Sequence, residues 1–323
     1  MRKELGIFIL LVVLCIIVSI KNPQFISNAN IQNMSRLIGM YGIFSIGAGI
    51  VIITGGIDLS IGSILALFGV VLSIMLTEWH WPAIVALAVI LAFGAFLGTI
   101  HGLLITRIKV QPFIVTLCGL LIYRGLARYI ANDSTRGFGT GEGFKWLAYL
   151  ATGSFLHVPM PFVLLIIVAV IMWVVLHRSV YGRYLLAVGN NEEAARYSGL
   201  NSKNIITAAY IISGVLAGIA SILVAFYTNS ISPSSHGNFY ELYAIAAAVL
   251  GGCSLRGGEG SIIGILIGTA LLQVLRNLVN LLEIPGSLDF AVMGTVILIG
   301  VIADQLVKKR SSKMVKVKAA VRS

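Results

Sequence analysis

The stretch from Thr54 to Ser63, which reads TGGIDLSIGS, concentrates polar chemistry in the middle of a long apolar region. Its single carboxylate, Asp58, stands between two apolar runs, and an ionisable side chain there is costly unless it is paired, capped or hydrated. We expect the stretch to break a helix, with Asp58 and Ser60 capping the N-terminus of the helix that follows. Asp58 is then either a structural cap or a gate residue.

A second candidate site is a polar stripe on an otherwise apolar helix. Gln273, Asn277 and Asn280 recur at positions i, i+4 and i+7, with Arg276 beside them. Polar side chains within a membrane span usually face protein or water. The stripe therefore predicts either hydrogen bonds between helices or a weakly polar lining of a path for a hydroxylated solute.

Recognisable catalytic and metal-binding patterns are missing from the sequence. It has no G-x-x-x-x-G-K-[ST] loop for nucleotide and no H-E-x-x-H motif. The cysteines Cys15, Cys118 and Cys253 lack metal-ligand spacing, so we interpret them as small apolar residues. We expect no catalytic residue, no metal site and no cofactor, and a membrane-embedded enzyme is disfavoured.

The connection over residues 178–204 is predicted to contain a short helix that is terminated at both ends. Asn191 caps its start, Glu192 and Glu193 occupy its first turn, where the helix dipole favours negative charge, and Gly199 takes a left-handed closing position. Such a rigid helix suits a membrane domain that must transmit force to a soluble partner. The residues expected to contact that soluble partner are Asn191, Glu192, Glu193, Ala194, Ala195, Arg196 and Gly199.

Composition sets the class of protein. The 323 residues are 58% hydrophobic and 11% charged, whereas soluble domains carry about 25% charged residues. The long, continuous apolar segments predict an integral membrane protein built of helices. The net charge of +11 reflects basic loops that set membrane orientation, and nucleic acid is not an expected partner.

The predicted fold is an all-α, polytopic transmembrane bundle of about ten spans with both termini cytoplasmic. Residues 1–307 form the transmembrane domain, and residues 308–323 form a basic cytoplasmic tail close to lipid headgroups. This topology places the Thr54–Ser63 stretch near the cytoplasmic side. The predicted spans are 5–21, 36–54, 61–76, 83–106, 113–130, 161–177, 205–228, 240–252, 261–282 and 288–306, of which 240–252 is a candidate broken or re-entrant element.

Three motifs together resemble a known family. They are TGGIDLSIGS at 54–63, AVGNNEEAAR at 187–196 followed by Ser198-Gly199, and GGCSLRGGEGS at 251–261. The chain is similar to the ribose-type permeases of bacterial ABC importers, within the binding-protein-dependent inner-membrane component family that also includes branched-chain amino acid permeases. The resemblance covers nearly the whole chain. Its signature positions are Gly55, Gly56, Asp58, Ser60, Gly62, Gly251, Gly252, Gly257, Gly258 and Gly260.

The resemblance implies a multi-pass protein of the bacterial inner membrane that moves a monosaccharide, ribose or a similar sugar. Its implied partners are two ABC ATPase subunits or one fused double ATPase, a soluble sugar-binding protein, a second permease chain in a homodimer or heterodimer, and membrane lipid. ATP hydrolysis is then on a separate subunit, contacted through the helix that begins at Asn191. The alternative is an ion-coupled secondary transporter of a small polar solute, for which Asp58 and Asp289 are the nearest coupling carboxylates.

The segment from Ala131 to Pro161 is the longest connection on the predicted outer side. It is either an ordinary interfacial loop or a docking surface for the binding protein. The second alternative rests on its charged residues, since charged pairs would orient such a partner. Glu142 and Lys145 are the charges expected to contribute, and the fallback docking loop is 229–238.

Overall fold

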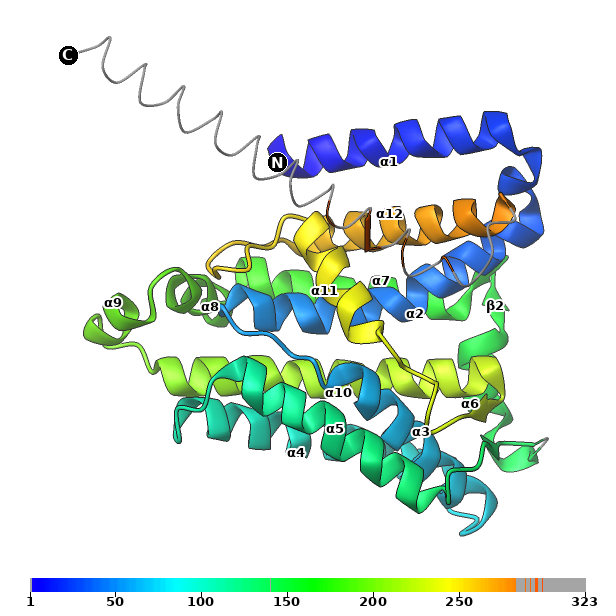
Figure 1. The fold of residues 1–323 in the computed structure, drawn as a ribbon, viewed down its shortest axis with the longest axis horizontal. Helices are drawn as coiled ribbons and strands as arrows, with labels where there is room; N and C mark the ends of the chain where they lie inside the picture. Colours follow the sequence, from blue (N-terminus) through cyan, green and yellow to red (C-terminus); the bar gives the residue numbers. More distant parts are fainter. Residues whose placement is uncertain are drawn as a thin grey trace.

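The computed structural model describes residues 2–139 and 141–282, together with positions 288, 291, 294, 295 and 298. Within this part the chain is a helical bundle with two short antiparallel strand pairs (Figure 1). The continuously described part of the chain ends at residue 282. It therefore does not include the predicted span at 288–306, Asp289 or the basic tail. The helices are α1 (Arg2–Lys21), α2 (Asn28–Ile53), α3 (Ile61–Thr77), α4 (Ala83–Thr106), α5 (Pro112–Ile130), α6 (Lys145–Thr152), α7 (Met160–Trp173, continued by a π-helical turn at Val174–Arg178), α8 (Val180–Asn190), α9 (Glu192–Tyr197), α10 (Ser202–Thr228), α11 (Tyr240–Leu250) and α12 (Ile262–Leu281).

Seven of these helices are long and apolar enough to cross a membrane, namely α1, α2, α4, α5, α7 with its π-helical turn, α10 and α12. Two further apolar helices, α3 and α11, are shorter. At 1.5 Å per residue the 11 residues of α11 extend about 17 Å, well short of the roughly 30 Å hydrocarbon core. Nine of the ten predicted spans thus have a helix at the expected place. The tenth is not described, so the total of ten remains a prediction.

The helices form layers around α2 and α10, which are the most buried of the span-length helices. Figure 1 shows α1 at one edge beside α12, with α2, α7 and α11 next, then α10, and α3, α4 and α5 at the other edge. We call the end of the bundle that carries α8 and α9 the α9 end. The opposite end, near α6, is the α6 end.

Small residues let neighbouring helices approach closely within the chain. A Cβ on Gly98 of α4 would lie 2.7 Å from the Ile211 Cα atom of α10, and one on Gly102 would lie 2.6 Å from the Thr207 Cα atom. Real Cβ atoms essentially never come that close to backbone. The glycine spacing in α4 therefore serves packing inside one subunit, as close helix approach in membranes requires.

Two antiparallel strand pairs close the α6 end. β1 (Arg136–Gly137) pairs with β4 (Ser230–Ile231), and β2 (Ser154–Phe155) pairs with β3 (Val158–Pro159). The Arg136 guanidinium forms an ion pair with Glu78 after α3. These contacts tie the loop after α5 to the ends of α3 and α10.

Candidate functional site

The first break in the helices lies at residues 54–60. From the last turn of α2 the chain runs back into the bundle as a non-helical segment before α3 begins (Figure 1). The Ile57 carbonyl accepts hydrogen bonds from Thr116 Oγ1 of α5 at 3.2 Å and from the Tyr210 hydroxyl of α10 at 3.3 Å. Non-helical backbone at membrane depth is tolerated only where protein or water satisfies it in this way.

Asp58 lies inside the bundle and is only 2% exposed. Its Oδ1 atom accepts hydrogen bonds from the Ser60 backbone N–H at 3.0 Å and the Ser60 hydroxyl at 2.6 Å, and its Oδ2 atom accepts one from Ser213 at 3.1 Å. Ser213 is the twelfth of the 27 residues of α10, which places Asp58 near the middle of that helix.

This position corrects one expectation, and the predicted location of the stretch near the cytoplasmic side stays a prediction. Ser60 does occupy the position before α3, yet its side chain makes no capping bond. Asp58 instead holds Ser60 and Ser213, so it joins the first broken span to α10.

The second break precedes α11, which the sequence marked as a candidate broken element. The Arg124 guanidinium of α5 donates to the carbonyls of Pro233 at 2.9 Å and His236 at 2.7 Å, within the non-helical segment that leads to α11. Glu241, in the first turn of α11, is 6% exposed. A Cβ on Gly62 would overlap both the Gly237 carbonyl and the Glu241 carboxylate, so the N-termini of α3 and α11 meet at this glycine.

The three glycine-containing motifs come together at the α9 end. The Gly258 N–H donates to the Ile53 carbonyl of α2 at 2.9 Å. A Cβ on Gly189 of α8 would overlap that same carbonyl and lie 2.6 Å from the Gly258 nitrogen, and a Cβ on Gly257 would lie 2.8 Å from the Gly55 nitrogen. We call the contact of Ile53, Gly55, Gly189, Gly257 and Gly258 the glycine junction. It joins α8 to the entry of the first broken span and to the loop after α11.

Two further signature glycines, Gly251 and Gly260, also make close contacts. Gly251 and Gly264 pack against each other where α11 ends and α12 begins, and Gly260 packs against Ile53. The positive φ angles among the signature glycines are 82° at Gly55, 97° at Gly252, 82° at Gly257 and 75° at Gly258.

The predicted helix after Asn191 is present as α9. The Asn191 side chain accepts a hydrogen bond from the Ala194 N–H at 2.9 Å. Gly199 has φ +85°, and the bonds from Gly199 N–H to Arg196 O and from Leu200 N–H to Ala195 O close the helix as a Schellman motif. Both predicted ends are therefore confirmed.

The two alanines of α9 differ in exposure. Ala195 is 6% exposed and belongs to the core, whereas Ala194 is exposed. Glu192 accepts a hydrogen bond from the Ser202 hydroxyl at the start of α10 at 3.0 Å. Ala195, one of the two small residues expected to meet a partner, is thus used within the chain. Tyr197, which is 79% exposed, is the large side chain that α9 presents outward.

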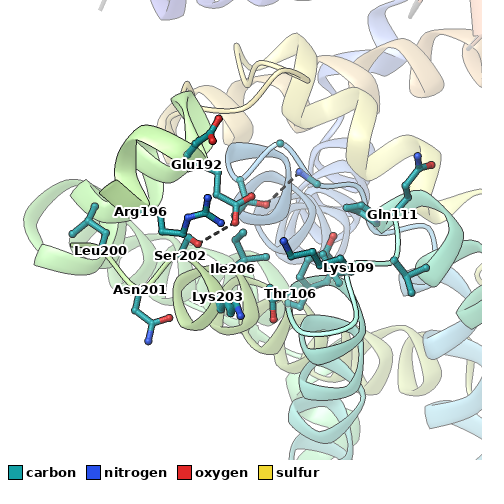
Figure 2. A pocket seen from close by; sticks show the side chains of 18 residues that line it. Thr106, Lys109, Gln111, Glu192, Arg196, Leu200, Asn201, Ser202, Lys203 and Ile206 are labelled. Carbon is teal, nitrogen blue, oxygen red and sulfur yellow. Dashed lines mark hydrogen bonds between the residues drawn. The ribbon is translucent and has the colours of Figure 1, made fainter. Parts of the chain in front are cut away.

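A cavity of about 660 Å³ opens at the α9 end (Figure 2). Its walls come from α9, the start of α10, the connection between α4 and α5, and the Thr54–Gly56 stretch. Glu192, Glu193 and Arg196 of α9 and Lys109 and Lys203 all line it. The charged side chains of α9 therefore face this cavity. Tyr210 also lines it, so the inner end of the cavity lies beside the first broken span.

The four residues of the polar stripe line a second cavity, at the α6 end. It has a volume of about 160 Å³ and lies between α2 and α12. Along α12 the stripe runs from exposed Asn280 to Gln273, which is 4% exposed. Helix contact is also present, because Asn277 exchanges hydrogen bonds with Asn30 of α2 at 3.0 and 2.7 Å. The hydrogen bonds between helices that the stripe predicted are thus present, and its role as the lining of a solute path stays a prediction.

The sequence pattern did not single out two of the residues that build these sites. Arg124 is a charged residue within an apolar span, and that signal alone marks a candidate functional residue. Tyr41 of α2 accepts a hydrogen bond from Arg276 at 3.1 Å, and no sequence signal distinguishes it from other aromatic residues. Within the described residues no group of three or more His, Cys, Asp or Glu side chains could hold a metal ion.

Comparisons with known proteins identify the family. The family described as branched-chain amino acid transport system / permease component matches residues 30–301. The ribose import permease protein RbsC of Bacillus subtilis (strain 168) is 41% identical over 306 residues, which cover 94% of this chain and 93% of the relative. RbsC of Escherichia coli (strain K12) is 40% identical over 297 residues, or 92% of each chain.

A further relative has a different sugar in its name. The D-allose transport system permease protein AlsC of Escherichia coli (strain K12) is 33% identical over 303 residues, which cover 94% of this chain and 91% of the relative. No solved structure was found to match. The chain thus belongs to the family of transport-system permease components, among its ribose-type ABC permeases.

Proposed function

We propose that this chain is the membrane-spanning permease of a bacterial ABC importer that carries ribose or a similar monosaccharide across the inner membrane. A soluble binding protein delivers the sugar, and ATP is hydrolysed on separate subunits that contact the α9 end. Family membership and the sugar permeases among its relatives support this function. A second permease chain completes the assembly.

The distribution of charge supports the proposed orientation. The α9 end carries Arg107 and Lys109 between α4 and α5, Arg183 and Arg196 on α8 and α9, and Arg256 after α11. Basic residues are enriched in cytoplasmic loops. The α9 end is then cytoplasmic and the α6 end faces the binding protein.

The observation that carries the proposed coupling is the glycine junction beneath α9. Gly189 of α8 contacts the Ile53 carbonyl, where the first broken span begins, and the Gly258 N–H, in the loop that follows the second. A movement imposed on α8 and α9 by an ATPase subunit therefore reaches both broken spans through backbone contacts. Rigid elements with close packing are the means by which such movement travels.

Energy coupling separates this function from ion-coupled transport. The permease, its ATPase and its binding protein are reconstituted in liposomes, and ribose uptake is measured with ATP inside or with an imposed proton or sodium gradient. We expect uptake with ATP and none with either gradient alone. Gradient-driven uptake without ATP would replace the importer with a secondary transporter.

The contact with the ATPase is tested at the closing turn of α9. Gly199 has a positive φ, but no atom lies within 4 Å of the position that a Cβ would take, so substitution there strains only the backbone. Gly199→Val should leave the permease in the membrane while ATPase retention or sugar uptake falls, because β-branched residues disfavour this conformation. Gly199→Asn is the matched control, since asparagine tolerates the left-handed position.

The charge on α9 gives a second test of that contact. Glu193→Lys should act in the same direction as Gly199→Val. Normal complex retention, ATP hydrolysis and uptake in both variants would mean that α9 is an ordinary surface helix, and would remove the coupling proposal.

A further inference from the structure

The Gln273 residue is largely buried, but its amide has no hydrogen-bond partner among the described residues. The side chain is 4% exposed, it lines the cavity at the α6 end, and none of the described residues bonds to it. The amide nitrogen and oxygen are not among the fully buried, unpaired polar atoms of the described residues, so they remain accessible within the cavity that Gln273 lines. Both groups are therefore available to a ligand that enters this cavity.

The cavity wall opposite α12 is formed by α2. Asn33 lies toward the outer mouth, Met34 and Leu37 form an apolar surface, and Tyr41 lies deepest. On the α12 side, Asn280 and Gln273 are seven residues apart, which is about 10 Å along a helix. A small ligand would thus contact amides on one wall and an apolar and aromatic surface on the other, a combination typical of small-molecule sites.

The floor of the cavity is held by Arg276. Its guanidinium lies over the rings of Tyr41, at 5.5 Å, and Tyr243, at 4.7 Å, and donates to the Tyr41 hydroxyl at 3.1 Å. A separate, narrow cavity of about 10 Å³ shares Tyr41, Gln273 and Arg276 with the first and is also lined by Ser45 and Thr269. A ligand that enters from the α6 end stops at this constriction, beside Gln273.

The lining chemistry restricts the class of ligand. None of the eight described lining residues is acidic, so an ammonium group, as in an amino acid, would find no charged partner. Amides supply both donors and acceptors, which matches the paired donor and acceptor character of sugar hydroxyls. The volume of about 160 Å³ is below the roughly 300–1,000 Å³ of sites for drug-sized ligands, which suits a single small sugar.

We infer that this cavity is a monosaccharide-binding subsite within the permease, in which Gln273 hydrogen-bonds a sugar hydroxyl above the Arg276–Tyr41 floor. The sugar released by the binding protein is then bound a second time, and selected a second time, before the constriction opens. This inference rests on the proposed sugar-import function and adds a site to it.

The test uses the reconstituted permease–ATPase–binding-protein complex. Gln273→Leu keeps the approximate size of the side chain and removes both hydrogen-bonding groups. Gln32→Leu is the matched control, because Gln32 lies on α2 but lines neither of these two cavities. Loss of one hydrogen bond predicts about a tenfold lower ribose uptake for Gln273→Leu at a subsaturating ribose concentration, with membrane abundance and docking of the binding protein unchanged.

Deoxy sugars distinguish binding from packing. Ribose and its deoxy analogues that the binding protein still delivers are compared in wild type and Gln273→Leu. One analogue, which lacks the hydroxyl bound by Gln273, should lose uptake in wild type but show no additional loss in Gln273→Leu. An equal loss for every sugar in Gln273→Leu would assign Gln273 a packing role and overturn the inference.

Ligand protection gives an independent measurement. In a variant without Cys15, Cys118 and Cys253, Gln273→Cys should react with a small water-soluble thiol reagent, and ribose added without binding protein should slow that reaction. Unchanged labelling with ribose would refute the subsite while ATP-driven ribose uptake by wild type persists. Absence of ATP-driven uptake in wild type would instead refute the proposed function itself.

Discussion

Gly189→Ala tests whether the glycine junction joins α8 to the broken spans. The added Cβ would lie 2.6 Å from the Gly258 nitrogen and overlap the Ile53 carbonyl. Neither backbone group can move alone, because the Gly258 N–H is bonded to that carbonyl at 2.9 Å. The substitution must therefore displace α8 or break this hydrogen bond.

The magnitude follows from three contributions. Overpacking typically costs about 1–3 kcal/mol, and loss of the hydrogen bond adds about 1 kcal/mol. Alanine in place of glycine within a helix returns about 1 kcal/mol. The net expectation for Gly189→Ala is destabilisation by about 1–3 kcal/mol. Gly125→Ala on α5, where no atom lies within 4 Å of the Cβ position, retains only the favourable contribution.

The assay compares both variants in lipid nanodiscs and in the assembled importer. Thermal unfolding should occur at a lower temperature for Gly189→Ala and at the same or a higher temperature for Gly125→Ala. In the assembled complex, Gly189→Ala should lower the amount of sugar moved per ATP hydrolysed. An unfolding temperature and a transport ratio equal to wild type for Gly189→Ala would refute the reasoning.

Three further predictions concern other elements. Asp58→Leu should lower the amount of folded protein, because each buried partner left unbonded costs about 1–3 kcal/mol. Asp58→Asn should retain most expression and transport. If the leucine variant were as abundant as wild type, the structural role of Asp58 would be contradicted. Arg124→Met should increase thiol labelling of Ser234→Cys, in the segment before α11, and should reduce uptake. Arg124→Lys should change both less, because lysine keeps the charge and a hydrogen-bond donor. Equal labelling in the two variants would show that the segment does not depend on this guanidinium. Charge reversal at Glu142 and at Lys145 should weaken binding-protein stimulation of ATP hydrolysis and leave basal hydrolysis intact, and if neither variant alters stimulation, docking moves to the 229–238 loop.

Local sequence signals determined the class of protein, most helix positions and the ends of α9. The apolar runs place the helices because each span must satisfy its own backbone within lipid. The Asn191 cap and the left-handed Gly199 were predictable for the same reason, since both depend on neighbours within a few residues. The three motifs, likewise local, were sufficient to indicate the family.

Contacts between distant residues decided the rest. Hydropathy could not show that the stretch containing Asp58 turns inward, because the groups that make this possible, Thr116 and Tyr210 on the Ile57 carbonyl, come from two other helices. Nor could it show that Gly189 meets Gly258, since their approach depends on how α8 packs against the loop after α11. Backbone satisfaction and steric fit across helices are properties of the packed bundle, so only the tertiary structure determines where these polar and glycine residues act.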